Sequence, residues 1–276
     1  MTNGKYPRHA SELADLVTAI EEFVLPGFLP TVPPIAASTI VRTQGSCFAT
    51  HIYNALKAAG VQARHIEFTE AVNSPLANRY LFEYVRSDVT AYAHPAHATI
   101  FPEKQLNNLR MQVSDEDLFV FTLGLAMCWF DRASNVPVIN PDPKNLQDYE
   151  WRIVDAAENE AALVYIVDAL RQLNPSIKIV LTVSPVPLNR SPGFESSVAA
   201  DCISKSTLRV AVHNYLAKQP DNVFYWPSFE IVRWLGAHLP PVFGEDDGLL
   251  RHVNQSMVNV ITTLFLKHFV APRPGQ

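Results

Sequence analysis

The sequence predicts an α/β protein, in which helices cover both faces of a mainly parallel sheet in a three-layer α/β/α sandwich. Two observations point to this class. Apolar runs rich in β-branched residues alternate with helical patterns from Thr39 onward. Apolar residues make up 48% of the 276 residues and charged residues only 18%, which allows a sizeable core. We therefore expect a folded domain without internal repeats.

Five strands are expected where β-branched and aromatic residues gather. They lie at Thr39–Val41, Ala63–Phe68, Leu118–Leu123, Ile177–Val183 and Val223–Trp226. Five helices are expected from apolar residues at helical spacing, at His51–Ala59, Asn78–Ser87, Ala157–Leu173, Val198–Ala217 and Asn254–Phe269. Because helices separate successive strands, the pattern favours βαβ units, and functional residues should follow the carboxyl ends of the strands.

We expect residues 1–276 to form one domain. Residues 1–38 are rich in proline and should form an N-terminal arm that wraps the domain, with a helix at Ala10–Phe23. The stretches 71–112 and 135–152 are rich in asparagine and proline. We expect them to be loop-rich insertions with short helices, long enough to cover a site.

Composition argues against several classes of protein. The formal net charge of −5 and the lack of a Lys/Arg run argue against a nucleic-acid partner. No apolar stretch has the length of a signal peptide or a membrane span. The cysteines Cys47, Cys128 and Cys202 are scattered, which suggests neither a disulfide framework nor a zinc site. We expect a soluble, cytoplasmic protein, and the sequence leaves its oligomeric state open.

The run Gly45-Ser46-Cys47-Phe48-Ala49 has the form of a nucleophile turn. It follows an expected strand and leads into a helix that Gly60 would cap. Such a turn exposes a nucleophile where free backbone N–H groups stabilise an anion. Both Ser46 and Cys47 are candidates. A thiol at a helix N-terminus has a lowered pKa, whereas a serine needs a general base. The alternative is a buried turn that only packs.

Other candidates follow later strands. Gly124 would let the backbone approach a ligand and donate its N–H to an oxyanion, or it simply makes a tight turn. The prolines at Ser184–Leu188 predict a rigid wall of a cleft. Lys205 lies between two serines, and we favour a solvated or capping helix turn over a catalytic Ser-Lys pair. For Glu230 we favour a structural role, and we expect Cys128 to lie in the core.

His252 is the best candidate for a general base. It follows an acidic loop, Glu245-Asp246-Asp247, and precedes the last helix. A carboxylate of this loop would fix its tautomer. His94 and His97 have no carboxylate nearby in sequence, so we expect no metal site.

Several blocks of the sequence resemble the GSCFA family, and the similarity runs from about Gln44 to Phe269. The blocks are Gly45–Ala49, Val120–Leu125, Leu181–Leu188 and Ser204–Arg209. The resemblance implies the flavodoxin-like fold of the SGNH-hydrolase-like superfamily. Enzymes of that superfamily are esterases, lipases, carbohydrate deacetylases and some acyltransferases.

The resemblance also assigns roles. The superfamily's Gly-Asp-Ser block places Cys47 at the nucleophile and Ser46 at the aspartate. Its Gly-x-Asn-Asp block matches Gly124 but has Ala126 instead of the asparagine that donates to the oxyanion. The superfamily's glycine of the second block has no obvious counterpart, and Asn73 or Asn78 would supply an amide there.

The superfamily's final block, Asp-x-x-His, matches His252 but not its acidic partner. Leu249 occupies the aspartate position, and Asp247 lies five residues before the histidine. We expect Asp247 or Asp246 to orient His252.

These residues predict an ester hydrolase that uses Cys47 or Ser46 with His252 on an acyl ester, expected on a carbohydrate. The backbone of Cys47 and Gly124 would bind the oxyanion. No cofactor is required. One alternative is an O-acyltransferase with acetyl-coenzyme A as donor, since a thioester intermediate is close in energy to that donor. Another is an inactive carbohydrate-binding module.

Overall fold

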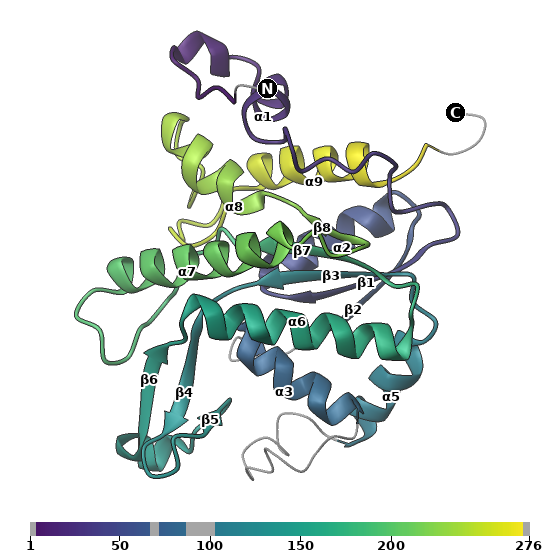
Figure 1. Ribbon diagram of the computed structural model, residues 1–276. Helices are drawn as coiled ribbons and strands as arrows, with labels where there is room; N and C mark the ends of the chain where they lie inside the picture. Colours follow the sequence, from purple (N-terminus) through teal and green to yellow (C-terminus); the bar gives the residue numbers. More distant parts are fainter. Residues whose placement is uncertain (1–3, 67–71, 87–102, 273–276) are drawn as a thin grey trace.

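The computed structural model describes residues 4–66, 72–86 and 103–272. A five-stranded, fully parallel sheet with the order β2-β1-β3-β7-β8 lies at its centre (Figure 1). Its strands are β1 (Ile40–Gly45), β2 (Gln62–Ile66), β3 (Leu118–Leu123), β7 (Lys178–Val183) and β8 (Val223–Tyr225). These are the five strands expected from the sequence. Their order is that of flavodoxin-like sheets, and the direction of winding reverses between β1 and β3.

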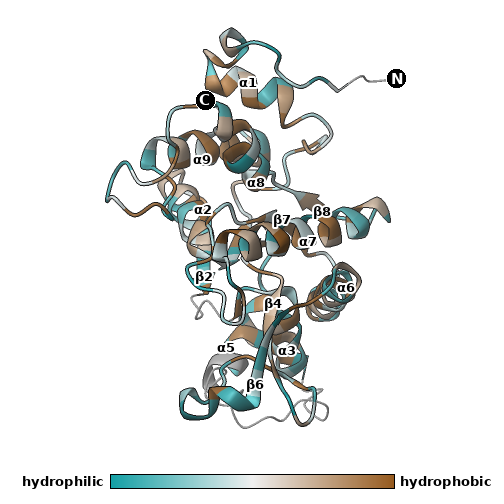
Figure 2. Ribbon diagram, turned by 90° about the vertical axis from the view of Figure 1, so that its left-hand side faces the viewer, coloured by the Kyte–Doolittle hydropathy of each residue, from teal (hydrophilic) through white to brown (hydrophobic). Residues whose placement is uncertain are grey.

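Helices cover both faces of this sheet, so the expected three-layer sandwich is confirmed. One face bears α3 (Pro75–Arg86), α5 (Glu103–Val113), α6 (Ala156–Leu173) and α7 (Ser197–Ala217). The other bears α2 (Cys47–Ala58), the π-helical turn η4 (Ile231–Leu235) and α9 (Gln255–Phe269). The short helix α8 (Ser228–Glu230) and the 3₁₀ turn η5 (Gly236–His238) flank η4 in the chain, and Phe229 of α8 packs with the first layer. Figure 2 shows apolar residues along the central strands between these layers.

The alternation of side chains along β3 explains the two layers of core. Phe119 and Phe121 pack with the helices α3, α6 and α7, whereas Leu118 and Val120 pack with α2 and α9. Successive side chains of a strand point to opposite faces, so a strand covered on both faces is largely apolar. Every residue of β3 is buried.

The expected helices are present, with small shifts at their ends. The largest shift is in α2, which begins at Cys47 instead of His51 because Ser46 caps it and accepts a hydrogen bond from the Phe48 N–H. Gly60 follows its end with a φ of 73°, as expected for a cap glycine. No helix among the described residues has the length and apolar character needed to cross a membrane.

The N-terminal segment packs on α9. The expected single helix at Ala10–Phe23 is instead a 3₁₀ turn η1 (Ala10–Leu13) and a helix α1 (Leu16–Phe23). The helix restarts because the Asp15 side chain accepts hydrogen bonds from the backbone of the first turn of α1. Farther along, the Ile35 N–H donates to the carbonyl of Phe269, the last residue of α9, and the Ile35 carbonyl accepts from the Ala271 N–H just beyond it.

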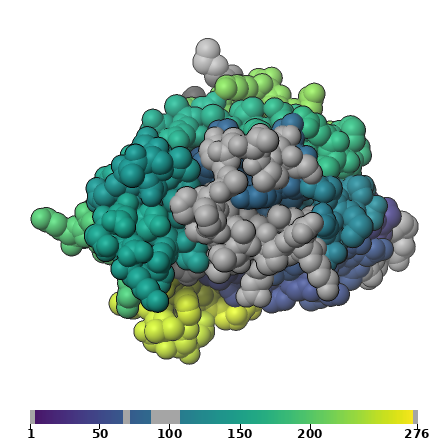
Figure 3. Space-filling view, turned by 90° about the horizontal axis from the view of Figure 1, so that it is seen from below, coloured from purple at the N-terminus to yellow at the C-terminus, as the bar shows by residue number. Residues whose placement is uncertain are grey.

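A second, antiparallel sheet was not expected. It has the order β5-β4-β6, with β4 (Met127–Asp131), β5 (Pro137–Val138) and β6 (Tyr149–Ile153), and a 3₁₀ segment η3 (Pro143–Asp148). Figure 3 shows it as the teal flank at the left of the molecule. The stretch 135–152 is therefore not simply a loop with short helices. None of its residues lines the cavities beside Cys47.

A buried ion pair links β1 to the segment before β3. The Arg42 Nε donates to Glu116 Oε1 at 2.6 Å, and the side chains are 3% and 0% exposed. Replacing Glu116 by glutamine leaves the arginine charge buried without a counter-ion, so we expect a loss of about 3 kcal/mol in the free energy of unfolding, measured with urea. The exposed pair Arg132–Glu150 is the control. Glu150→Gln should change the free energy of unfolding by less than about 1 kcal/mol. Equal losses would contradict this account.

Candidate active site

The candidate site lies where the strand order reverses. β1 and β3 are neighbours, and Gly45 at the end of β1 is in register with Thr122. The residues that follow these strands, Ser46 and Cys47 after β1 and Gly124 after β3, therefore meet at the same edge of the sheet. In open α/β sheets this crevice is where ligands bind.

Gly45 permits the turn that starts α2. Its φ is 127°, and a Cβ at this position would lie 2.1 Å from the Thr122 carbonyl oxygen. The same oxygen accepts a hydrogen bond from the Ser46 N–H at 3.2 Å. The turn therefore lies directly against β3, and only glycine fits both the space and the backbone conformation.

The two candidate nucleophiles have different environments. The Ser46 side chain is buried and caps α2 through its hydroxyl oxygen. Cys47 is exposed at the first position of α2 and lines a cavity of about 330 Å³. This arrangement gives Ser46 a capping role and makes Cys47 the residue that a substrate can reach.

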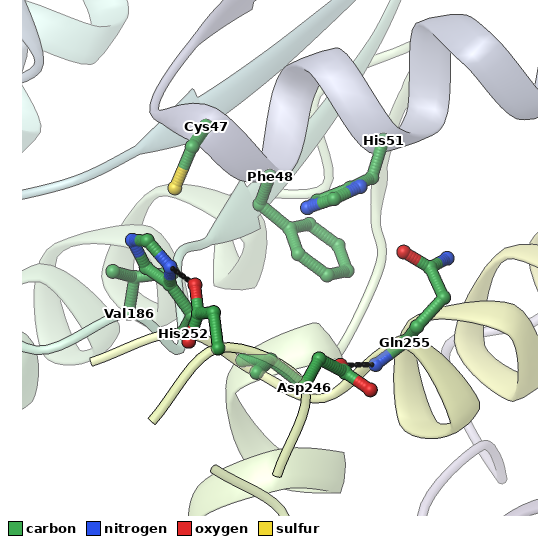
Figure 4. Close-up of a pocket in the computed structure, with 9 residues that line it drawn as sticks. Cys47, Phe48, His51, Val186, Asp246, His252 and Gln255 are labelled. Carbon is green, nitrogen blue, oxygen red and sulfur yellow. Dashed lines mark hydrogen bonds and ion pairs between the residues drawn. The ribbon is translucent and has the colours of Figure 1, made fainter. Parts of the chain in front are cut away.

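His252 lies beside Cys47 in the same cavity. Its Nδ1 is 2.5 Å from Asp247 Oδ2. Figure 4 shows the Cys47 sulfur pointing toward the His252 ring. The hydrogen bond from His252 and a second one from the Leu249 N–H hold the pKa of Asp247 below its usual value. A carboxylate on Nδ1 leaves the other ring nitrogen as the proton acceptor.

The three carboxylates of the acidic loop have separate partners. Glu245 accepts from the Asn254 amide at 2.8 Å, and Asp246 accepts from the Gln255 N–H at the start of α9. Only Asp247 contacts His252 among them. Of the two carboxylates that we considered, Asp247 is thus the one placed to orient the histidine.

A tight turn brings Asp247 to His252 across five positions of sequence. Gly248 has a φ of 73°, and its N–H donates to the Gly244 carbonyl. The His252 N–H in turn donates to the Leu249 carbonyl at 2.8 Å. The loop reverses direction between the two side chains, which explains why the spacing differs from Asp-x-x-His.

The backbone N–H of Gly124 is not positioned as we expected. It donates to the Asn73 carbonyl at 2.8 Å, and the Leu125 N–H shares that acceptor at 3.3 Å. A Cβ on Gly124 would lie 2.8 Å from the Asn73 Cβ, so the glycine allows the two segments to approach. Gly124 lines a small cavity beside Cys47, but its N–H is already bonded.

Asn73 and Asn78, the two candidates for an amide donor, have different roles. The Asn78 amide donates to the Val72 and Ser74 carbonyls, and its oxygen accepts from Gln44, so it holds the start of α3. Asn73 lines the small cavity together with Cys47 and is 7% exposed. Among the residues that the structure describes, none bonds to the Asn73 side-chain amide, which is therefore placed to donate to a ligand.

His51 lines the same cavity as Cys47 and His252, and sequence reasoning missed it. It lies one helical turn after Cys47 in α2. This spacing places both side chains on one face of the helix, and it could have indicated His51 from the sequence. Burial lowers the pKa of His51, and repulsion from His252 lowers it further. A neutral imidazole beside the site is therefore favoured near pH 7.

Lys205 is not on a solvated helix turn, as we had favoured. It is 2% exposed in α7, and its Nζ donates to the Gly124 carbonyl. The neighbouring Ser204 hydroxyl accepts from the Ala126 N–H at 2.8 Å. The pattern misled because Lys205 faces the sheet edge, where α7 packs against the turn that follows β3.

The remaining expectations are met in part. Glu230 bonds to Arg209 and to the Tyr225 hydroxyl, a structural role as favoured. Cys128 is buried, and burial raises its pKa to about 12. Val186, Pro187 and Leu188, from the proline-rich segment, line the cavity walls.

The expected absence of a metal site stays a prediction. His94 and His97 lie outside the described residues. In the part of the chain that the structure describes, no three His, Cys, Asp or Glu side chains gather as a metal site would require.

A family model described as GSCFA family matches residues 85–265, more than half of the chain. The chain belongs to the GSCFA family. The resemblance stated from the sequence blocks is thereby confirmed, although the Gly45–Ala49 block precedes the matched segment. The sheet order and the two helical layers agree with the fold that this resemblance implied.

No curated protein matches this GSCFA chain. Among solved structures it is similar to a protein described as a GDSL-like lipase from Parabacteroides merdae, with 12% identity and a TM-score of 0.46 over 86% of this chain and 98% of that chain. It is also similar to a carbohydrate esterase family 3 protein from Talaromyces cellulolyticus, with 11% identity and a TM-score of 0.40 over 83% and 93% of the two chains. A carbohydrate esterase family 2 enzyme from Corynascus thermopiles has 16% identity and a TM-score of 0.42 over 87% and 69%.

Proposed function

We propose that this GSCFA protein is an ester hydrolase in which Cys47 attacks the acyl carbonyl and His252 transfers the proton. One observation carries the proposal: the Cys47 sulfur points toward the His252 ring, whose Nδ1 is held by Asp247 (Figure 4). A nucleophile, a base and a group that orients the base are the parts that acyl transfer needs. Here they come from α2 and from the loop before α9.

The first half of the reaction acylates the cysteine. His252 accepts the thiol proton, and Asp247 stabilises the resulting imidazolium. A bond forms between the sulfur and the carbonyl carbon while the carbonyl π electrons move to oxygen. When the carbonyl re-forms, the bond to the alcohol oxygen breaks, and the alcohol leaves with the proton from His252. The product is an acyl thioester on Cys47.

The second half releases the acyl group. His252 removes a proton from water, and the oxygen attacks the thioester carbonyl. When the carbonyl re-forms, the carbon–sulfur bond breaks, the carboxylic acid is released, and His252 returns its proton to the Cys47 thiolate. Hydrolysis therefore uses only side chains of this chain and water. The cavity beside Cys47 also contains Phe48, Asp246 and Gln255, an aromatic ring with carboxylate and amide groups. Such a lining suits an acylated sugar, so we propose an ester on a carbohydrate as substrate.

O-acyl transfer is a second candidate, and the accessible cysteine favours it. A thioester on Cys47 is close in energy to an acyl-coenzyme A donor, so acetyl-coenzyme A would load the enzyme reversibly. A sugar hydroxyl would then replace water as acceptor. Incubation with acetyl-coenzyme A and a sugar, followed by mass measurement of the sugar, separates the two activities. Sugar binding without turnover of any ester would favour an inactive carbohydrate-binding module.

His252→Ala tests the proposed base. We expect kcat/KM for a short-chain aryl ester to fall about 10²- to 10⁴-fold, because proton transfer from the thiol and to the leaving group is lost. Asp247→Asn should cause a smaller loss than His252→Ala, because the group that transfers the proton remains although its tautomer is no longer fixed. The control is His238→Ala, an exposed histidine that bonds to Tyr6 outside the cavity. Full activity of His252→Ala would rule out the mechanism.

A further inference from the structure

Lys205 is a buried cation without a direct carboxylate partner. Its side chain is 2% exposed, and among the described residues its only hydrogen-bond acceptor is the Gly124 carbonyl. An ammonium group has three N–H donors, so two remain. Asp201, a buried carboxylate one turn earlier in α7, bonds to Arg233 and to the Leu188 N–H instead. A buried ammonium group without a counter-ion lowers the stability of the fold unless a ligand accepts its remaining hydrogen bonds.

The unused donors of Lys205 lie beside the nucleophile. Lys205 lines the small cavity together with Ser46, Cys47, Asn73 and Gly124. Burial lowers the pKa of Lys205 to about 8, while Asp201 and Cys47 act in the opposite direction. Cys47 and Lys205 are thus close enough to interact electrostatically. The cavity between them is where a carbonyl oxygen would lie during attack.

The backbone after β3 has no donor left for an oxyanion. The N–H groups of Gly124 and Leu125 donate to the Asn73 carbonyl, and the N–H of Ala126 donates to Ser204. Ala126 itself stands where the resembled superfamily has an asparagine donor. Any oxyanion donors on this side must therefore be side chains.

We propose that Lys205 is a catalytic residue whose ammonium group donates to the oxyanion formed when Cys47 attacks the carbonyl. The inference rests on the proposed function, because it concerns the same reaction. In this step the new carbon–sulfur bond places negative charge on the carbonyl oxygen, and the fixed cation stabilises it. The Asn73 amide, which lines the same cavity, completes the donor pair. Charge at a buried site is stabilised more strongly than in water.

The test uses trifluoroacetophenone, a ketone without a leaving group. Its carbonyl accepts the Cys47 thiolate and stops at a tetrahedral oxyanion, which ¹⁹F NMR detects without turnover. We compare wild type with Lys205→Met, which removes the charge at similar length, and Lys205→Gln, which keeps a donor. Thermal unfolding checks that each variant is folded. If the methionine variant does not fold, the glutamine variant carries the comparison.

We expect Lys205→Met to weaken adduct affinity about 10²-fold, as for loss of one oxyanion donor. The pH at which the adduct oxygen becomes protonated should rise in the same variant. Other charged groups that face this site or Lys205 are unchanged between the variants. They are His51, His252, Asp246, Asp247, Asp201, Arg233 and Arg251.

Lys218→Met is the matched control, since Lys218 is an exposed lysine at the end of the same helix and pairs with Glu160. It should bind the ketone as wild type does. The proposal would be overturned if the Lys205 variants bound the ketone as tightly as wild type and their adduct oxygen became protonated at the same pH. It would also be overturned if wild-type Cys47 formed no adduct. An adduct that depends on Lys205 in a protein that turns over no ester supports this inference while rejecting hydrolysis as the function.

Discussion

Cys47→Ala is expected to lower kcat/KM for a short-chain aryl ester by about 10³-fold or more, because the nucleophile itself is removed. No other side chain can replace it at the same place. Ser46 is adjacent, but its hydroxyl is buried and caps α2. The initial rate of ester hydrolysis at saturating and limiting substrate measures the effect.

Two controls make the Cys47 result specific. Cys202→Ala removes another exposed cysteine, on α7, and should leave the rate unchanged. Ser46→Ala should retain most of the activity but lose about 1 kcal/mol of stability, since it removes a helix cap. A Ser46→Ala variant without activity beside an active Cys47→Ala variant would transfer the nucleophile to the serine.

Gly45→Ala is expected to have the largest effect on stability, above about 4 kcal/mol in the free energy of unfolding. The added Cβ would lie 2.1 Å from the Thr122 carbonyl oxygen, which is backbone and cannot move aside. The backbone φ of 127° adds strain for any residue with a side chain. Equilibrium unfolding in urea measures the loss, and poor expression of folded protein would agree with it.

Gly27→Ala separates the two causes. Gly27 also has a positive φ, 86°, but a Cβ there meets no atom within 4 Å. We expect it to lose only about 1 kcal/mol, the penalty of the left-handed backbone alone. A Gly45→Ala variant as stable as Gly27→Ala would contradict the tight contact between the turn and β3.

The central strands of the parallel sheet could be predicted because they are largely apolar. β3 is buried along its whole length, and five of its six residues are apolar, although β1 also buries Arg42 and Gln44. The antiparallel sheet gave no such signal. Each residue of β6 is only partly buried, and β5 consists of Pro137 and Val138. Short strands with both faces partly exposed have no clear period of two.

The candidate site shows a similar division. Cys47, His252 and Asp247 were predicted because a strand-to-helix turn and a histidine after an acidic loop are local patterns. Lys205 was assigned to a solvated turn because its neighbours in sequence are polar. Its burial depends on the packing of α7 against Gly124, a contact between residues far apart in the chain. Such contacts have no local signature.

Donor assignment also depended on tertiary structure. The Gly124 N–H was expected to serve the oxyanion, but it bonds to the Asn73 carbonyl. Asn73 belongs to the segment before α3, which lies about fifty residues before Gly124 in the chain and was expected only as part of a loop-rich insertion. The same contact brings the Asn73 side chain to the cavity. The sequence therefore predicted which residues lie near the site, but it did not predict which of their N–H groups are available to donate to an oxyanion.

The most direct test of the central claim is the mass of the protein during reaction with an aryl acetate. With Cys47 as nucleophile, we expect one acetyl group on the peptide that contains Cys47, labile to neutral hydroxylamine as a thioester is. His252→Ala should form it more slowly, and Cys47→Ala should not form it. An acetyl group on Ser46, or ester hydrolysis by Cys47→Ala at the wild-type rate, would contradict the account.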